Sequence, residues 1–506
     1  MSDESSPETR IATGRIRGVA RPGHQFFTGI PYAAAPTGPG RFASPAPVAP
    51  WDGVRDATRP GPTSPAPQRG GFGGMDLRPV LGDGWARGED YLTVTVTTPD
   101  VAARGLPVLV FVHGGGFVSG TGQAELHDGA AFARDGVVLV TLNYRLGVAG
   151  WLDIPGAPAN RGLLDVIAAL TWVAENIHAF GGDPDRVTVA GQSAGAMIVA
   201  ALLAAPQADG LFHRAISQSG SGLCAFAPEQ ASWVTRSVCG ALGVPATAEA
   251  LSATDDDRLV AVLAEVPPVD HAAHGHRDTS LGNGLFKPVI DGVLLDQQPA
   301  LVLERVTKAG ATSRGPVAKD LLIGTNSEEA NLYFVPNGSG RELTKADLLA
   351  AAARRHAEPE ALVARYHARF PDASAATLAA RLITDVYAES SRALADAHAG
   401  RPGSRTYAYE FGWRSTAFDD ALGACHCVEL PFVFDRTEIA ALHGEHALLG
   451  PDRPAHSIAS RMHASWVSFV EHGDPGWEPY NSRSRATMHI DEEWQLAHEA
   501  DHTAAR

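Results

Sequence analysis

The stretch Val187-Thr188-Val189-Ala190-Gly191-Gln192-Ser193-Ala194-Gly195-Ala196 joins a β-branched run to a Gly-x-Ser-x-Gly motif, and an alanine-rich helical pattern follows at once. A strand, a sharp turn and a helix in this order lift a serine hydroxyl out of a sheet, and small flanking residues avoid a clash between strand and helix. The turn also places Ser193 near the positive end of the helix, as acyl transfer requires of a nucleophile. Because both flanking elements are present, we interpret the motif as a nucleophile elbow rather than a chance match among 53 glycines.

A second glycine motif, His113-Gly114-Gly115-Gly116-Phe117, comes directly after the apolar run Val108 to Val112. Consecutive glycines allow a ligand close to the backbone, and in an α/β-hydrolase such a loop forms the oxyanion hole with the N–H that follows the nucleophile. We therefore expect the donors to be Gly115, Gly116 and Ala194. A phosphate cradle is the competing interpretation, but the loop lacks the Gly-Lys-Ser/Thr ending and the Gly-x-Gly-x-x-Gly spacing. His113 precedes the serine, which favours an orienting or core role.

Short apolar runs alternate with helical patterns, which favours an α/β fold with a mostly parallel sheet covered on both faces. We predict one α/β-hydrolase domain over residues 1–506, with alanine-rich helical insertions at about 226–279 and 343–400 over one end of the sheet. The helix expected between the early strands and the serine is Leu163 to Asn176. The expected strands are Val108 to Val112, Val137 to Leu142, Val187 to Ala190, Leu321 to Ile323, and Thr406 to Phe411.

The composition is that of a globular protein, with 44% hydrophobic and 19% charged residues. A formal charge of −16 argues against nucleic-acid and anionic-membrane partners. The acidic N-terminus is unlike a secretory signal, no uncharged apolar run is long enough to span a bilayer, and four cysteines in 506 residues do not make a disulfide scaffold. These features predict a cytoplasmic location and a monomer or small homo-oligomer, between which the sequence does not decide.

A serine nucleophile needs a histidine base and a carboxylate to hold that base, in the chain order Ser, Asp/Glu, His for this fold. Twenty histidines leave the base open on composition alone. Two segments narrow the search: Gly324-Thr325-Asn326-Ser327-Glu328-Glu329-Ala330, just past a predicted strand, and Ala424-Cys425-His426-Cys427-Val428-Glu429-Leu430-Pro431-Phe432, before an apolar run.

At these residues the chain resembles the type-B carboxylesterase family, which includes bacterial para-nitrobenzyl-type esterases and the cholinesterases. The resemblance covers nearly the whole chain. It is also carried by Phe27-Thr28-Gly29-Ile30-Pro31-Tyr32-Ala33, Trp51-Asp52-Gly53-Val54-Arg55-Asp56-Ala57, Asn143-Tyr144-Arg145-Leu146-Gly147, Asn176-Ile177-His178-Ala179-Phe180-Gly181-Gly182-Asp183-Pro184, Ser217-Gln218-Ser219-Gly220-Ser221, Trp466-Val467-Ser468-Phe469 and Gly473-Asp474-Pro475.

The resemblance implies a catalytic triad of Ser193, Glu329 and His426, with Glu329 rather than Glu328 as the acid. It also matches Ser219 to a serine that supports the acid by a hydrogen bond; a plain loop or cap serine is the equal alternative. No cofactor and no metal are implied.

Four positions depart from the family pattern. Tyr91 stands where the family's Asp-Cys-Leu segment has cysteine, so the disulfide that usually pins the long N-terminal loop cannot form, and the loop Thr63 to Glu89 is expected to be weakly held. Gln192 replaces a glutamate found before the serine in many relatives. Ala330 replaces a glycine after the acid, and Cys427 takes a small-residue position after His426.

A zinc site at Cys425-His426-Cys427 is the alternative use of these residues. The spacing is poor for tetrahedral zinc and no second ligand pair lies close in sequence, so two small semi-buried thiols are preferred.

The expected activity is hydrolysis of a small-molecule carboxylic ester through an acyl-enzyme. A thioester, carbamate or amide hydrolase and a non-catalytic interaction protein of the same family are the alternatives; the filled triad positions disfavour the latter. A choline-type substrate is disfavoured by an aromatic content of only 7%. Apolar residues near the motifs are candidates for the pocket and equally for ordinary core. They are Phe117, Cys224, Phe226, Leu332, Phe334 and Phe432.

Overall fold

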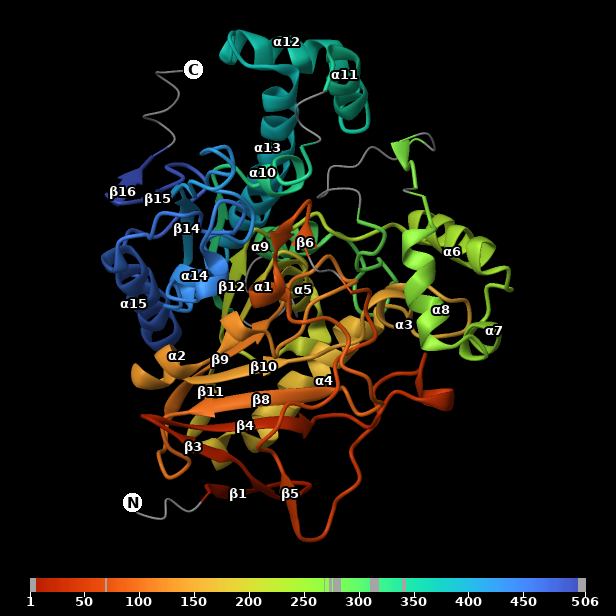
Figure 1. The fold of residues 1–506 in the computed structure, drawn as a ribbon, viewed down its shortest axis with the longest axis vertical. Helices are drawn as coiled ribbons and strands as arrows, with labels where there is room; N and C mark the ends of the chain where they lie inside the picture. Colours follow the sequence, from red (N-terminus) through yellow and green to blue (C-terminus); the bar gives the residue numbers. More distant parts are fainter. Residues whose placement is uncertain are drawn as a thin grey trace.

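A twisted eleven-stranded sheet runs through the protein, with helices on both of its faces (Figure 1). The computed structural model describes residues 6–68, 71–267, 269–272, 275, 284–309, 318–338 and 343–498. The strand order is β16-β15-β14-β13-β12-β11-β9-β10-β8-β4-β3, parallel from β10 to β15 and antiparallel at both ends. The α/β fold predicted from the alternation of elements is confirmed.

The five predicted strands are present in this sheet as β9, β10, β11, β13 and β14, whereas β12, which lies between β11 and β13, was not predicted. The bounds of the strands of this sheet are β3 (Val19–Arg21), β4 (His24–Pro31), β8 (Thr93–Thr98), β9 (Leu106–Val112), β10 (Val138–Leu142), β11 (Gly182–Gln192), β12 (Arg214–Gln218), β13 (Asp320–Asn326), β14 (Thr406–Phe411), β15 (Thr487–Ile490) and β16 (Gln495–Ala497). Smaller pairings join β1 (Glu8–Ile11), β2 (Gly14–Arg17) and β5 (Val54–Asp56), and join β6 (Gly71–Phe72) and β7 (Met75–Asp76).

The central strands are buried on both faces, which explains their continuous apolar runs. In β9, Val108, Val110 and Val112 belong to one core cluster, while Leu109 and Phe111 belong to a second cluster on the opposite face. The first core is completed by α4 (Arg161–Asn176), α5 (Ala194–Ala204) and α9 (Pro299–Ala309), and the second by α2 (Ala130–Arg134), α14 (Leu430–Val433) and α15 (His456–His472).

Helix α4 with the turn after it, Arg161–Phe180, is long and apolar enough to cross a membrane by length and composition alone. In the fold 56% of its apolar window is buried, and α4 packs on β11 and α5. A core helix of a folded domain meets the same criteria.

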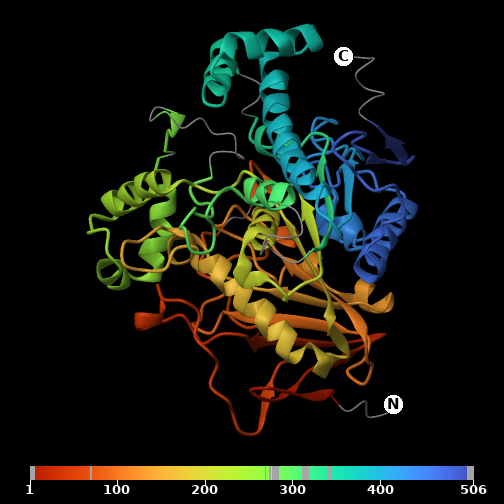
Figure 2. The same cartoon turned by 180° about the vertical axis from the view of Figure 1, so that it is seen from behind.

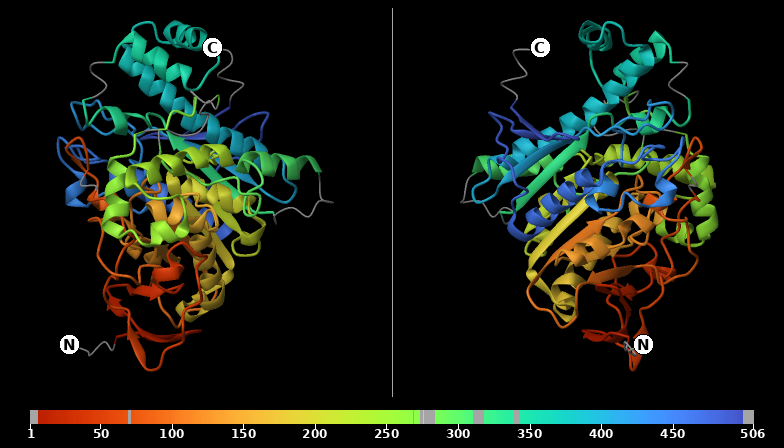
Figure 3. Two further views of the ribbon diagram at one scale, coloured as in Figure 1. Left: turned by 90° about the vertical axis from the view of Figure 1, so that its right-hand side faces the viewer. Right: turned by 60° about the vertical axis from the view of Figure 1, so that its left-hand side comes forward.

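Helices lie at the two predicted insertions (Figures 2 and 3). The first holds α6 (Pro228–Leu242), α7 (Ala248–Ser252) and α8 (Asp256–Ala261); the second holds α11 (Lys345–Ala353), α12 (Pro359–Arg369) and α13 (Ala375–Ala399). The second insertion has a small core of its own, formed by Leu348, Ala352, Val363, Leu378, Ala379 and Leu382. The remaining short helices are α1 (Arg78–Leu81), α3 (Gly147–Trp151) and α10 (Asn331–Phe334).

The long N-terminal loop is held by packing and hydrogen bonds in place of a disulfide. Met75, Leu77 and Val80 are buried in the second core. At its base Thr63 N–H donates to Ala86 O at 3.0 Å, and Ala86 N–H donates to Thr63 Oγ1 at 2.8 Å. The described part of this loop is therefore better anchored than the missing cysteine suggests.

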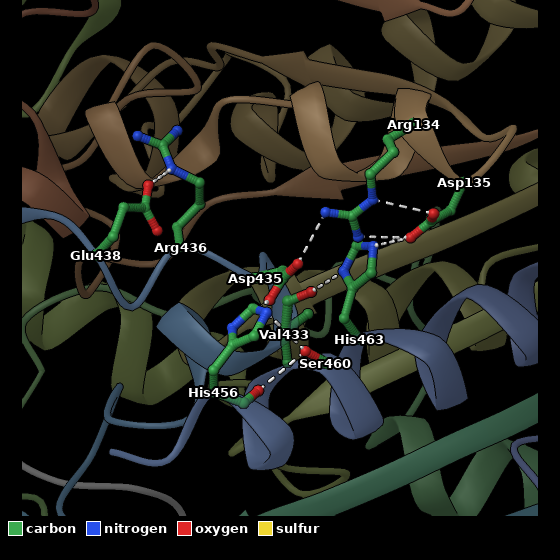
Figure 4. A network of polar contacts seen from close by, with 9 residues as sticks. All are labelled: Arg134, Asp135, Val433, Asp435, Arg436, Glu438, His456, Ser460 and His463. Atoms are coloured by element: carbon green, nitrogen blue, oxygen red, sulfur yellow. Dashed lines mark hydrogen bonds and ion pairs between the residues drawn. The ribbon is translucent and has the colours of Figure 1, made fainter. Parts of the chain in front are cut away.

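A polar network fastens α15 to the loop between α2 and β10 (Figure 4). His463 Nδ1–H donates to Val433 O at 2.7 Å, and His463 Nε2 lies 3.1 Å from Asp135 Oδ2. Arg134 pairs with Asp135 at 2.7 Å and with Asp435 at 2.9 Å. The network stabilises the second core, which lies on the face of the sheet opposite to α4 and α5.

A fully buried ion pair links the β10–α3 connection to α4. Arg145 and Asp165 are both 0% exposed, and Arg145 donates to the carboxylate through Nε at 2.8 Å and Nη2 at 2.7 Å. Its remaining nitrogen donates to Ala43 O at 2.6 Å. Every strong donor of the guanidinium therefore has an acceptor.

Replacing Asp165 by asparagine is expected to lower the free energy of unfolding by about 3–5 kcal/mol, because an unneutralised guanidinium would stay buried. Urea denaturation measures this loss. Asp257→Asn is the matched control: it breaks the exposed pair with Arg87, whose partners are 62% and 66% exposed, and should change stability little. Equal stability of the two variants would contradict the prediction.

Candidate active site

The serine of the Gly-x-Ser-x-Gly motif stands between β11 and α5. Ser193 has φ 58° and ψ −120°, a conformation that non-glycine residues rarely adopt, and its side chain is partly accessible. A Cβ added at Gly191 would collide with the backbone of Gly195, and one at Gly195 would collide with Val112 O. The two glycines are thus required for the strand and the helix to meet at so sharp a turn.

The triple-glycine loop lies directly beside this serine. A Cβ added at Gly114 would come within 3.2 Å of Ser193 Cβ. Gly115 and Gly116 have φ of 107° and 65°. Within the described residues, no backbone hydrogen bond uses the N–H groups of Gly115, Gly116 or Ala194. These three donors can therefore serve an oxygen that is not part of the chain.

His113 is part of the support of this loop. It is buried, it lies stacked on Tyr144 with ring centroids 4.5 Å apart, and its Nδ1–H donates to Gly114 O at 2.8 Å. Burial lowers the pKa of His113 to about 4. A neutral, stacked imidazole fits the orienting role expected from the sequence.

His426 and Glu329, 97 residues apart in sequence, form a buried hydrogen-bonded pair. Glu329 Oε2 accepts from His426 Nδ1–H at 2.6 Å, and Glu329 Oε1 accepts from Asn326 N–H at 2.8 Å. Glu329 is 0% and His426 2% exposed. The carboxylate therefore fixes the ring with its hydrogen on Nδ1, which leaves Nε2 as the basic nitrogen.

Glu328 plays a different part. Its carboxylate contacts Arg414 and accepts from Ala424 N–H at 3.0 Å, while its own N–H donates to Ala424 O at 3.0 Å. Glu328 holds the loop that carries His426, and the structure brings only Glu329 to the imidazole.

Gln192 lies against the basic nitrogen. Its Nε2 is 3.2 Å from His426 Nε2, and Ser193 is the next residue in the chain. Because Nε2 carries no hydrogen when Nδ1 donates to Glu329, it can accept from the Gln192 amide. The lone pair of His426 Nε2 thus faces Gln192, the residue that precedes the serine in the elbow.

A second buried carboxylate, Glu429, stands behind the pair. It accepts from Asn326 Nδ2 at 2.6 Å and from Gln218 Nε2 at 3.3 Å, and the Asn326 amide also donates to Cys425 O at 2.7 Å. Burial, reinforced by the charge of Glu329, raises the pKa of Glu429 to about 7. Asn326 thereby holds the acid through its main chain and binds the histidine loop through its side chain.

This raised pKa predicts a pH-dependent stability. Between the ordinary glutamate pKa and about 7 the folded state binds more protons than the unfolded state, so the stabilisation is complete below pH 4.5 and is lost as pH rises toward 7. Because one pKa unit corresponds to about 1.4 kcal/mol, the free energy of unfolding should fall by about 3 kcal/mol over this range. In urea denaturation from pH 5 to 8, Glu429→Gln should flatten this slope. Glu328→Gln is the control, and an unchanged slope in Glu429→Gln would refute the assignment.

Two tyrosines pack on the imidazole. The ring centroids of Tyr333 and Tyr387 lie 5.7 and 5.2 Å from that of His426, and their hydroxyl groups are 2.9 Å apart. Their packing restricts the movement of the ring. Neither was found from the sequence, because α10 and α13 carry no motif.

Ser219 lies at the end of β12, fully buried, with φ 53°. Its Oγ has no hydrogen-bond partner among the described residues, so the structure lacks the bond to Glu329 that the resemblance implies. Asn326 N–H occupies that place. The residue that donates to Glu329 in the structure, Asn326, stands three positions before it in the same sequence motif.

Cys425 and Cys427 are buried, and burial raises the pKa of both thiols well above the usual range. In the part of the chain that the structure describes, no group of three or more His, Cys, Asp or Glu side chains is placed to hold a metal ion.

Two of the six pocket candidates line cavities. Phe226 lines a cavity of about 400 Å³, and Phe334 lines both this cavity and a neighbouring one of about 450 Å³. The other four are buried in the cores: Phe117, Cys224, Leu332 and Phe432.

Comparison with known proteins agrees with this geometry. Residues 5–505 match the family described as "Carboxylesterase family". The chain is 34% identical to the para-nitrobenzyl esterase of Bacillus subtilis (strain 168), covering 95% of this chain and 94% of the relative, and 33% identical to the phenmedipham hydrolase of Pseudarthrobacter oxydans, covering 93% and 90%. The chain belongs to the carboxylesterase family. It is a carboxylic ester hydrolase, as the sequence predicted.

Solved structures of carboxylesterases superpose on the whole chain. The Geobacillus stearothermophilus carboxylesterase EST55 matches with a TM-score of 0.82 at 33% identity, covering 98% of this chain and 99% of that chain. A thermophilic PNB esterase matches with a TM-score of 0.82 at 30% identity, covering 99% of each chain. The α/β-hydrolase fold of this carboxylesterase is thereby confirmed.

Proposed function

We propose that Ser193, His426 and Glu329 carry out the ester hydrolysis of this carboxylesterase. His426 Nε2 takes the Ser193 proton as Oγ attacks the ester carbonyl, and the N–H groups of Gly115, Gly116 and Ala194 bind the resulting oxyanion. Glu329 holds the Nδ1–H tautomer and stabilises the imidazolium. Protonated His426 then gives its proton to the leaving alcohol, which leaves an acyl group on Ser193.

Water completes the cycle. His426 Nε2 takes a proton from a water molecule, which attacks the acyl carbonyl, and the same proton returns to Ser193 Oγ as the acid departs. The observation that carries the proposal is the 2.6 Å bond between His426 and Glu329, with Nε2 turned toward the serine elbow.

Labelling with a fluorophosphonate tests the proposal. The reagent should modify Ser193 alone, since only an activated serine attacks phosphorus, and peptide mass spectrometry locates the adduct. A burst of p-nitrophenol from an activated ester should equal the labelled fraction. Modification of another serine would overturn the assignment.

Activity is expected to survive exhaustive chelation. Apart from the water molecule and the ester itself, the chain supplies the proton donors and acceptors of the proposed cycle. His426→Gln should be inactive at every pH. Loss of activity with a chelator, restored by zinc, would favour a metal role for Cys425 and Cys427 instead.

Carbamates are a second substrate class, favoured by the similarity to a phenmedipham hydrolase. The oxyanion donors meet the same carbonyl oxygen in both, whereas the carbamoyl nitrogen slows deacylation. We propose benzyl-type esters, of the kind named in the para-nitrobenzyl relative, as the better substrates. Pre-steady-state release of the alcohol from matched benzyl esters and benzyl carbamates distinguishes the two classes.

The cytoplasmic location and the absence of nucleic-acid and membrane partners remain predictions from charge and composition. Cell fractionation and size-exclusion chromatography of the full chain test location and oligomeric state.

A further inference from the structure

The 400 Å³ cavity lies between the two helical insertions. Residues of the first insertion and of the segment after it form one side; α10, α11 and α13 form the other. Much of its wall is apolar, including Phe226, Val234, Leu285, Phe334 and Ile383. Such a wall fits a hydrocarbon chain, for which each buried methylene raises affinity about fourfold.

The cavity also carries an excess of positive charge. Lys287, Arg354 and Arg355 line it, against two carboxylates, Asp270 and Asp347. Among their hydrogen bonds, Asp347 Oδ2 accepts from Thr344 N–H at 2.8 Å, and Asp270 Oδ1 accepts from Ala272 N–H at 3.1 Å. In a chain of formal charge −16, a cationic apolar cavity is unusual.

The cavity is close to the proposed catalytic residues. Phe334 lines it, and the preceding residue, Tyr333, packs on His426. Burial raises the pKa of Tyr387, the second tyrosine that packs on that imidazole, and the charge of Arg355 opposes this rise, so Arg355 is within electrostatic reach of Tyr387. Lys287 Nζ lies 5.2 Å from the Phe226 ring centroid.

We propose that this cavity binds a carboxylate at the end of the substrate remote from the scissile bond. The preferred substrates are then acidic esters, such as half-esters of dicarboxylic acids with an apolar chain between the two carbonyl groups. The inference rests on the proposed function of Ser193 and names its substrate class. Charge-assisted hydrogen bonds from arginine and lysine recognise the carboxylate, and the apolar wall receives the chain.

Matched ester pairs test the substrate class. The first series varies the acyl group: p-nitrophenyl esters of acyl chains of four to ten carbons that end in a carboxylate or in the isosteric, neutral carboxamide. The second series varies the alcohol: acetate esters of alcohols that carry the same two end groups. The carboxylate should raise kcat/KM about tenfold in one series, and this preference should fall with added salt. Equal kcat/KM for both ends in both series would overturn the inference.

Variants locate the effect. Arg354 is exposed at the end of α11, so Arg354→Gln should fold normally, raise KM for the acidic ester about threefold and leave the carboxamide ester unchanged. Arg354→Glu should raise the KM for the acidic ester further, and Lys287→Met should also raise it. Arg381→Gln is the control, because Arg381 is an exposed arginine of α13 that lines the neighbouring cavity. Equal effects of Arg354→Gln and Arg381→Gln would count against the site.

The two proposals fail in different ways. Carboxamide esters hydrolysed through Ser193 without a preference for acids would refute the acidic-ester inference alone. Hydrolysis of either ester that persists in Ser193→Ala would refute the role of Ser193.

Discussion

Replacing Ser193 by alanine is expected to lower kcat about 10⁶-fold, because the chain loses its only proposed nucleophile while the rest of the site stays in place. The variant should fold normally. Alanine removes one partly accessible oxygen atom, opens no cavity and tolerates the 58° φ no worse than serine does. Residual hydrolysis would come from the oxyanion donors and from binding alone.

Kinetics on a p-nitrophenyl ester and thermal unfolding of the same preparation measure the two effects separately. Ser217→Ala is the matched control, since Ser217 is a buried serine in the neighbouring strand β12. It should retain activity. Wild-type kcat in Ser193→Ala would rule out the proposed mechanism.

Replacing Glu329 by glutamine is expected to cost about 10⁴-fold in kcat. The amide can place its NH₂ against His426 Nδ1, which favours the tautomer with the hydrogen on Nε2 and removes the lone pair that must accept the serine proton. Among the described residues, Glu329 is the carboxylate that accepts from His426 Nδ1–H, at 2.6 Å, and it is fully buried.

Glu328→Gln provides the comparison within the same loop. Its carboxylate meets Arg414 and Ala424 rather than the imidazole, so a loss of about tenfold or less is expected from a loosened loop. A larger loss of kcat in Glu328→Gln than in Glu329→Gln would mean that Glu328, and not Glu329, is the acid of the triad.

Local motifs carried the prediction of the fold and of most of the site. The elbow at Ser193 and the glycine loop are short, contiguous and dictated by backbone geometry, so their consequences can be worked out from the residues themselves. Glu329 and His426 required the family resemblance, because nothing local shows that residues 97 positions apart meet.

The missed features arise from tertiary packing. The strand β12 escaped prediction because Arg214–Gln218 has polar residues at both ends, although its neighbours bury it. Tyr333 and Tyr387 lie on helices, where aromatic residues usually mean ordinary core. Glu429 was read as part of a motif, and its pairing with Asn326 and Gln218 depends on the meeting of three separate loops.

The small separate core of α11, α12 and α13 has an evolutionary consequence. Leu348, Val363 and Leu382 pack with one another and apart from the two cores that flank the sheet, yet two of these helices, α11 and α13, supply part of one wall of the cationic cavity. Mutations in α11 and α12 can accumulate with little effect on the sheet that holds the serine and the histidine, whereas α13 packs on β13 and carries Tyr387. Lineages of this enzyme are therefore free to exchange the substrates they accept while inheriting the same chemistry, and grafting residues 343–369 from a relative is a direct way to alter that choice in the laboratory.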